Sequence, residues 1–246
     1  MVALRSPAMF ISDLHLKSED DVHTRILLRF LREEAPGAGR LFVLGDLFEA
    51  YVGDDDGDPL LAVVADALHA LAAMDVEIAF VHGNRDFLLG KAFADRANML
   101  LLPDPCVIDL AGKPVLLSHG DRYCTDDREY MRWRAQMRDR DWQSGFLGQP
   151  LAARKAFAER ARAASAEHQK DLSAGISDVN AATVEGELRL FGIDTLIHGH
   201  THRPACHQHD LGGSMARRWV LSDWRGHGEA LVADERGTLS RVSLFA

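Results

Sequence analysis

The sequence contains little that would tie the chain to an oxidising compartment or to the interior of a membrane. Its three cysteines, Cys106, Cys124 and Cys206, form no Cys-x-x-Cys pair and suggest no disulfide framework. No signal peptide is apparent, since the apolar stretch at 9–11 is short and runs into Asp13. No apolar run approaches the ~18 residues that cross a bilayer. We therefore expect a cytoplasmic protein, with contact at a membrane surface left open.

Basic charge is scarce in the chain as a whole. The chain has 28 Lys and Arg against 37 Asp and Glu, a net charge of -9, which argues against a nucleic-acid binder because such proteins need a basic surface. The balance reverses between Arg122 and Lys170, where 11 Lys and Arg meet 7 Asp and Glu, giving 11 − 7 = +4. Both a solvated helical face and a segment that attracts an anionic substrate fit this reversal.

The length and the apolar pattern indicate an α/β fold. A chain of 246 residues, 47% of them apolar, is long enough for one domain with an insertion. Strand-like runs at 8–11, 41–44 and 76–81 alternate with segments of helical periodicity at 24–34 and 60–74. Such alternation predicts parallel strands joined by right-handed crossovers. Further strand-like runs lie at 99–102, 107–110, 115–117 and 195–197, with several more in the tail 205–245.

A long helical stretch at 126–190, broken near 145–150 and near 175, separates two polar blocks. We expect it to be a helical cap inserted into a single domain of residues 1–246. Its apolar side chains recur at helical intervals, which fits either a helix–helix core or the wall of an apolar chamber. Its first arginines fit either anionic lipid headgroups or an exposed helix face. The apolar side chains are Trp133, Met137, Trp142, Phe146, Leu147, Leu151 and Phe157, and the arginines are Arg128, Arg132, Arg134 and Arg138.

Five short polar blocks, almost all of them directly after apolar runs, carry side chains that are typical metal ligands. The carboxyl ends of parallel strands meet at one edge of a sheet, so we expect these side chains to converge. A carboxylate such as that of Asp46 can bridge two cations ~3.5–4 Å apart. Mixed oxygen and nitrogen donors without thiolate suit Mn, Fe or Zn better than Ca or Mg. The expected ligands are Asp13, His15, Asp46, Asn84, His119, His198 and His200.

The ordered set of blocks resembles the calcineurin-like metallophosphoesterase superfamily. The resemblance implies a two-sheet sandwich flanked by helices. It also implies two divalent metal ions, one held by Asp13, His15, Asp46 and His200, and the other by Asp46, Asn84, His119 and His198. The matching blocks are Asp13-x-His15, Gly45-Asp46, Gly83-Asn84-Arg85-Asp86, His119-Gly120-Asp121 and Gly199-His200-Thr201-His202.

Arg85 departs from many members of this superfamily, which have a histidine after the asparagine. Arginine is a poor general acid because its pKa exceeds ~12. It can nevertheless stabilise charge on a phosphate oxygen through bidentate hydrogen bonds. A phosphate that leaves from a diphosphate linkage needs little protonation, so Arg85 favours cleavage of a pyrophosphate bond over cleavage of an alkyl phosphate ester.

From about Phe10 to Trp224 the chain resembles, more narrowly, the UDP-2,3-diacylglucosamine pyrophosphatase family of bacterial lipid A biosynthesis. That family uses manganese at the cytoplasmic face of the inner membrane, and its cap houses acyl chains. The resemblance implies hydrolysis of UDP-2,3-diacylglucosamine to UMP and 2,3-diacylglucosamine 1-phosphate by water attack on the α-phosphorus. The matching motifs are Gly45-Asp46-Leu47-Phe48-Glu49, Gly83-Asn84-Arg85-Asp86-Phe87-Leu88, His119-Gly120-Asp121 followed by Cys124-Thr125-Asp126-Asp127, and Ile197-His198-Gly199-His200-Thr201-His202-Arg203-Pro204.

The same resemblance implies roles for individual residues. Asp46, Arg85 and His198 would be catalytic, the last two by stabilising developing charge. Gln169 stands where the family often has asparagine, and the family's cap lysine falls at Leu172, so that Lys170 is a candidate substitute. The implied substrate contacts are Asn84, Arg85, Asp127, Ser165, Gln169, Lys170 and His198.

Two other functions stay open on the sequence alone. A general metallophosphodiesterase or nucleotide phosphatase of the same superfamily would share the ligand set, although Arg85 and the long cap argue against it. A non-catalytic scaffold with the same fold would be expected to have lost ligands. For the leading reading we expect a monomer that acts on a lipid-linked sugar nucleotide, binds no nucleic acid and contacts the inner membrane peripherally.

Overall fold

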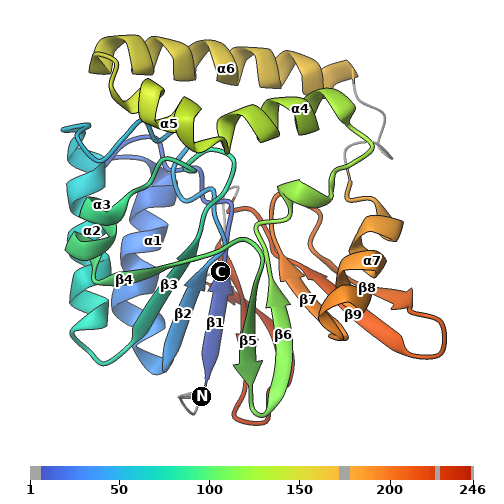
Figure 1. Cartoon of the computed structure of the whole chain (residues 1–246). Helices are drawn as coiled ribbons and strands as arrows, with labels where there is room; N and C mark the ends of the chain where they lie inside the picture. The colour runs from blue at the N-terminus through green and yellow to red at the C-terminus, as the bar shows by residue number, and fades with distance from the viewer. Residues whose placement is uncertain (1–6, 172–177, 225–227, 245–246) are drawn as a thin grey trace.

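Two mixed β-sheets pack face to face, with helices on both outer sides (Figure 1). The structure is a computed structural model, and it describes residues 7–171, 178–224 and 228–244. In the first sheet the strand order is β11-β10-β1-β2-β3-β4, and in the second it is β5-β6-β7-β9-β8. This arrangement confirms the expected two-sheet α/β sandwich.

The strands that lead into the polar blocks are parallel to one another within each sheet, as the sequence predicts. β1 pairs in parallel with β2, and β2 with β3, while β6 pairs in parallel with β7. The first sheet contains β1 (Ala8–Ile11), β2 (Arg40–Val43), β3 (Glu77–Val81), β4 (Met99–Leu102), β10 (Gly228–Ala233) and β11 (Leu239–Leu244). The second contains β5 (Cys106–Leu110), β6 (Lys113–Leu117), β7 (Thr195–His198), β8 (Ala205–Asp210) and β9 (Met215–Val220).

Apolar layers on both faces of the first sheet hold the sandwich together. Between the sheets, the rings of Phe10 and Phe42 stack with centroids 5.0 Å apart. Outside the first sheet, α1 and α2 bury apolar side chains such as Phe30 and Val64. Successive strand residues point to opposite faces, so strands covered on both sides are apolar almost throughout.

Helix starts explain small shifts from the predicted boundaries. α1 (Val22–Glu33) begins after Asp21, whose carboxylate accepts a hydrogen bond from the His23 backbone N–H. α2 (Pro59–Ala72) begins after Asp58 in the same way, with proline at its first position. α3 (Lys91–Ala97) completes this outer layer.

Three cap helices cross above the carboxyl ends of the strands (Figure 1). They are α4 (Arg128–Met137), α5 (Arg140–Leu147) and α6 (Leu151–Asp171). The predicted helical stretch has an extra break at Asp139, because its carboxylate caps α5 through the Trp142 backbone N–H. No helix in the described ranges is long and apolar enough to cross a membrane.

The last helix of the expected cap segment lies elsewhere. α7 (Ala181–Phe191) packs against the second sheet, where Val184 and Leu188 are fully buried beside Leu116 and Leu196. The cap helices of the described chain therefore lie between residues 128 and 171, and the boundary expected at 190 included a helix of the sandwich.

Candidate metal centre

The polar loops after β1, β2 and β3 touch one another through their backbones. The Asp13 N–H donates to the Gly45 carbonyl at 3.1 Å, and the His15 N–H donates to the Asp46 carbonyl at 3.0 Å. Glycine is required at Gly83, where a Cβ atom would lie 2.2 Å from Asp46 Oδ1. These close approaches bring the first, second and third polar blocks together.

The backbone is unusual at five of the donor residues. Their φ angles are positive, a region that residues with a Cβ atom seldom adopt, at a cost on the order of 1–3 kcal/mol each. Such strain persists only where surrounding structure enforces it, and it clusters at functional sites. The residues and angles are Asp13 (57°), His15 (52°), Asp46 (52°), His200 (68°) and His202 (52°).

One group of donors contains Asp13, His15 and His202. The Nε2 atom of His202 lies 3.2 Å from Nε2 of His15 and 3.3 Å from Asp13 Oδ1. Asp46 borders this group, since its Oδ2 atom lies 3.9 Å from His15 Nε2. Its other carboxylate oxygen, Oδ1, lies 3.7 Å from His119 Nε2. The Asp46 carboxylate thus lies between His15 and His119 with one oxygen toward each.

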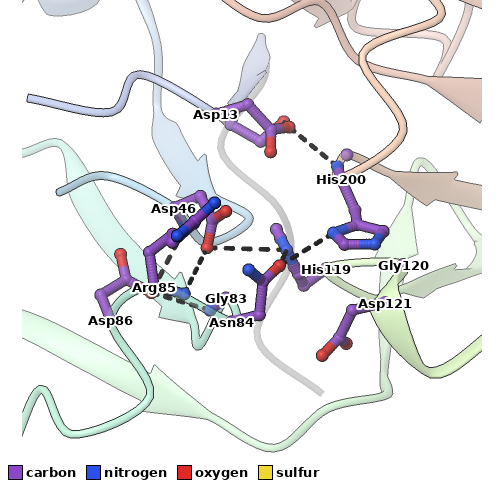
Figure 2. A network of polar contacts seen from close by, with 12 residues as sticks. Asp13, Asp46, Gly83, Asn84, Arg85, Asp86, His119, Gly120, Asp121 and His200 are labelled. Carbon is purple, nitrogen blue, oxygen red and sulfur yellow. Dashed lines mark hydrogen bonds and ion pairs between the residues drawn. The ribbon is translucent and has the colours of Figure 1, made fainter. Parts of the chain in front are cut away.

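The second group gathers around Asn84 (Figure 2). Its Oδ1 atom lies 3.0 Å from His119 Nε2 and 2.8 Å from His200 Nδ1. The Nδ1 atom of His119 lies 2.8 Å from the Leu44 carbonyl, which can only accept, so Nδ1 carries the proton. With Nδ1 donating to Leu44, the Nε2 lone pair of a neutral His119 ring faces Asn84, as in histidines that bind metals.

The charges inside the cluster favour a cation. Burial alone would lower the pKa of His119, but the Asp46 and Asp13 carboxylates outweigh burial and raise it to about 9. Burial would raise the pKa of Asp13, but His202, together with His119 and His15, outweighs burial and holds that pKa well below its ordinary value. Asp13 Oδ1 is buried and accepts no hydrogen bond from the described residues. Buried lone pairs that face one another fit divalent metal ions.

His198, which we expected to be a ligand, does not join this cluster. It is the last residue of β7 and is fully buried, with Nδ1 2.8 Å from the Gly199 carbonyl and Nε2 3.1 Å from the Arg218 guanidinium. Burial, and then Arg218, lower its pKa to about 3, so the ring is neutral at neutral pH. Both nitrogens are engaged away from the carboxylates.

The placement of the last polar block therefore favours a different ligand assignment from the one expected from the sequence. His202 lies beside Asp13 and His15, where His200 was expected, and His200 lies beside Asn84, where His198 was expected. The signal that the sequence analysis missed is the position of each residue relative to the end of its strand. His198 is still in β7, whereas Asp13 and His15 lie beyond the end of β1. Had the end of β7 been placed at His198, the following Gly199-His200-Thr201-His202 block would have indicated His200 and His202 as the ligands.

A cleft opens beside the candidate metal donors, between the core loops and the cap. Its empty volume is about 960 Å³, open solvent included. Asn84, Arg85 and Ser165 line it, and their contact with substrate stays a prediction. Asp127 is buried and caps α4 by accepting a hydrogen bond from the Tyr130 backbone N–H at 2.9 Å, so its contact with substrate stays a prediction.

Two further expected contacts lie beyond what the structure describes. Gln169 and Lys170 belong to the last turn of α6, and their side chains are outside the described part of the chain. Leu172 lies outside the described residues altogether. The assignments at these positions stay predictions.

The apolar side chains of the cap contribute both to helix–helix packing and to the wall of the cleft, the two roles that the sequence left open. Trp133, Phe146 and Phe157 line the cleft, together with Phe87 from the core. Phe146 also stacks on Trp142, with ring centroids 4.9 Å apart, and is almost fully buried. One aromatic cluster therefore forms part of the helix packing and part of the wall.

The basic residues of α4 divide into two kinds. Arg128 and Arg132 are exposed. Arg134 and Arg138 turn inward instead, toward the fully buried carboxylate of Asp121. Burial would raise the pKa of Asp121, but Arg134, His119 and Arg138 together outweigh burial and lower that pKa below its ordinary range. Arg134 and Arg138 therefore form neither a solvated face nor a lipid contact.

Comparison with known proteins identifies the family of this chain. Residues 6–204 match the family model described as calcineurin-like phosphoesterase. A UDP-2,3-diacylglucosamine hydrolase of Stenotrophomonas maltophilia (strain K279a) is 51% identical over 236 residues, covering 93% of this chain and 95% of that protein. One from Xanthomonas campestris pv. campestris is 50% identical, covering 93% and 96%. With its cluster of candidate metal donors at the strand ends of a two-sheet sandwich, the chain belongs to the calcineurin-like phosphoesterase family.

Proposed function

We propose that the chain hydrolyses the pyrophosphate bond of UDP-2,3-diacylglucosamine, releasing UMP and 2,3-diacylglucosamine 1-phosphate. One observation carries this proposal: the metal cluster opens directly into an apolar cleft, with Asn84 and Arg85 at the junction. The names of relatives about 50% identical over nearly their whole length support the same substrate.

We assign the metal ligands from the geometry. One ion would be held by Asp13, His15, Asp46 and His202, and the other by Asp46, Asn84, His119 and His200. When bound, two divalent ions activate water and polarise the phosphoryl oxygens. We propose Mn²⁺, because the donors are a mixture of carboxylate, amide and imidazole. His198 has no direct catalytic role in this assignment.

Arg85 links the cluster to the diphosphate. Its backbone N–H donates to Asp46 Oδ1 at 2.8 Å, which fixes the residue against the bridging carboxylate. Its side chain lines the cleft, and its buried Nε atom has no hydrogen-bond partner among the described residues. A guanidinium there can bind a phosphate oxygen and stabilise the charge that develops as the sugar phosphate leaves.

The cleft accounts for the lipid part of the substrate. Aromatic side chains from α4, α5 and α6 meet Phe87 of the core around it. Each methylene buried there stabilises binding by ~0.8 kcal/mol, so two acyl chains can contribute much of the affinity. A diacylated substrate resides in a membrane, and we therefore also propose peripheral contact with the cytoplasmic face of the inner membrane by a monomer.

The test compares substrates on the purified, Mn²⁺-loaded protein. We expect UMP release from UDP-2,3-diacylglucosamine to exceed by orders of magnitude the turnover of UDP-glucose and of p-nitrophenyl phosphodiesters at equal concentration. Equal turnover of the short compounds would instead assign a general phosphodiesterase. Absence of hydrolysis together with absence of Mn²⁺ binding would indicate a non-catalytic scaffold.

A further inference from the structure

One face of α4 points into the metal centre rather than toward solvent. Tyr130 and Arg134 lie in α4 and Arg138 is its C-terminal cap residue, and their spacing of four residues places them on the same side. Each of the three side chains makes a polar contact with a loop that carries a candidate metal donor. Tyr130 and Arg134 contact the loop after His119, and Arg138 contacts the residue before Asn84. The first helix of the cap therefore contacts the support of the cluster as well as the substrate cleft.

Arg138 contacts the peptide segment that precedes Asn84. Its Nη2 atom donates to the His82 carbonyl at 3.2 Å and to the Gly83 carbonyl at 3.0 Å. The guanidinium carbon lies 5.8 Å from the centre of the Phe87 ring, three residues after Asn84. One side chain of the cap thus contacts residues on both sides of an expected ligand.

Arg134 and Tyr130 contact the loop after His119. Arg134 donates to both carboxylate oxygens of Asp121, from Nε at 2.8 Å and from Nη2 at 3.2 Å, and the Tyr130 hydroxyl donates to Oδ2 at 3.0 Å. Asp121 is fully buried and lies two residues after His119, at the position that Figure 2 shows beside His200. The Tyr130 ring lies 5.8 Å from the His200 ring.

The donors of the first group are supported differently. His15 Nδ1 faces Glu49 at 3.5 Å, on the loop after β2. Asp13 Oδ2 accepts hydrogen bonds from Ser12 Oγ at 2.5 Å and from the His200 backbone N–H at 2.9 Å. These contacts come from loops of the sandwich. The contacts of α4 fall instead on the loops of Asn84 and His119 and on the His200 ring.

We propose that α4 positions the ligands of one metal ion only, the ion assigned to Asn84, His119 and His200, and that Arg138 is the positioning residue for Asn84. The inference rests on the proposed two-metal assignment. Two hydrogen bonds from a planar guanidinium fix the orientation of the 82–83 segment, and with it the direction in which the Asn84 amide oxygen points. The cap is then part of the metal centre as well as the wall of the cleft.

The test is Arg138→Met, which keeps an unbranched side chain beside Phe87 but removes the donors. Mn²⁺ is titrated into the metal-free, full-length protein without substrate and followed by calorimetry and electron paramagnetic resonance. We expect affinity at one of the two sites to fall about 10–100-fold, as for other residues that orient ligands, while the other site changes less than about twofold. The resonance signature of a coupled Mn²⁺ pair should then require excess Mn²⁺.

Two further variants sharpen the result. Arg138→Lys retains one flexible donor and should restore part of the lost affinity. Arg132→Ala removes an exposed arginine of the same helix and should bind both ions like the unaltered protein. With Arg138→Met, kcat at limiting Mn²⁺ should fall and return in excess Mn²⁺, with KM for the diacylated substrate changing less than about twofold.

Three outcomes would overturn the inference. Binding of two Mn²⁺ ions by Arg138→Met as tightly as by the unaltered protein would show that Arg138 does not position a ligand. Equal weakening of both sites, with a lower unfolding temperature of the metal-free variant, would show a general structural role. An unaltered protein that binds no Mn²⁺ pair would overturn the two-metal assignment itself, and this inference with it.

Discussion

At the scale of single residues, the metal centre depends on loops that approach one another more closely than ordinary side chains allow. Gly83 has room for no Cβ atom beside Asp46, and Asp13 and His15 adopt left-handed backbone conformations between loops that are hydrogen-bonded to each other. The sandwich thus holds a locally unfavourable backbone in place at the edge where the donors meet.

Gly83→Ala tests this close approach. The added methyl group would lie 2.2 Å from Asp46 Oδ1, so we expect a loss of ~1–3 kcal/mol in the free energy of unfolding and a large loss of activity. Urea unfolding measures the loss of stability, and the rate of UMP release from UDP-2,3-diacylglucosamine measures the loss of activity. Gly145→Ala is the matched control, because nothing lies within 4 Å of its added methyl and alanine favours the helix. Unchanged stability and activity of Gly83→Ala would contradict the described contact.

The ligand reassignment predicts opposite results for two histidines. His202→Ala should lose at least about tenfold in Mn²⁺ affinity at one site, because its Nε2 faces Asp13 and His15. His198→Ala removes a buried ring that contacts Arg218, so it should lower stability while the folded protein still binds two ions. Mn²⁺ stoichiometry of both variants measures the difference, and the reverse pattern would restore the assignment made from the sequence.

Metal binding should release protons. The pKa of His119 is raised to about 9 by Asp46 and Asp13 against the effect of burial, so below pH 9 the metal-free ring carries a proton that a metal ion must displace. Mn²⁺ affinity should therefore rise with pH up to about 9. Calorimetry in two buffers of different ionisation enthalpy measures the protons released. Proton uptake, or an affinity that is independent of pH between 6.5 and 8, would contradict this charge balance.

At the scale of elements, apolar periodicity was sufficient to predict most of the strands and helices. The runs before Asp13, Asp46 and Asn84 are buried on both faces, and their apolar character is visible in the sequence. The break at Asp139 and the place of α7 were missed. Each depends on a hydrogen bond or a packing surface supplied by distant residues, and helical periodicity does not encode which surface a helix covers.

The partners of charged side chains could not be predicted from the local sequence either. Arg134 and Arg138 look like members of an exposed basic face, because their partners, Asp121 and the Gly83 carbonyl, belong to other segments. Likewise, β7 ends at His198, so His198 is still held in the strand, whereas His200 lies beyond its end. The choice between these two histidines as metal ligands depends on where the strand ends. The donor types and the order of the blocks were predictable, whereas the direction of individual side chains was not.

Arg154→Met tests how α6 is held over the core. Arg154 is 2% exposed, and its guanidinium donates to the Val52 carbonyl at 2.6 Å and to Asp55 Oδ1 at 2.8 Å. Removing these bonds leaves the Val52 carbonyl without this donor, so we expect a loss of ~1–3 kcal/mol in stability. Because Val52 lines the cleft, KM for the diacylated substrate should rise while Mn²⁺ affinity is retained. Unchanged KM and stability would show that α6 does not depend on this anchor.

At the scale of the whole molecule, the substrate site lies where three parts of the chain meet. The first sheet supplies Asp13, Asp46 and Asn84 at its strand ends, and the second supplies His119 and His200 after β6 and β7. The cap helices lie above these strand ends (Figure 1), and their apolar side chains line the cleft. In the proposed function, the diphosphate would lie at the candidate metal centre and the lipid part beneath the cap.

The most direct test of the proposed reaction is hydrolysis of UDP-2,3-diacylglucosamine in water enriched in oxygen-18, with mass spectrometry of both products. Attack of water on the α-phosphorus breaks its bond to the bridging oxygen, which leaves with the sugar phosphate. We therefore expect one labelled oxygen in UMP and none in 2,3-diacylglucosamine 1-phosphate. Label in the sugar phosphate, or release of products other than these two, would contradict the proposed mechanism.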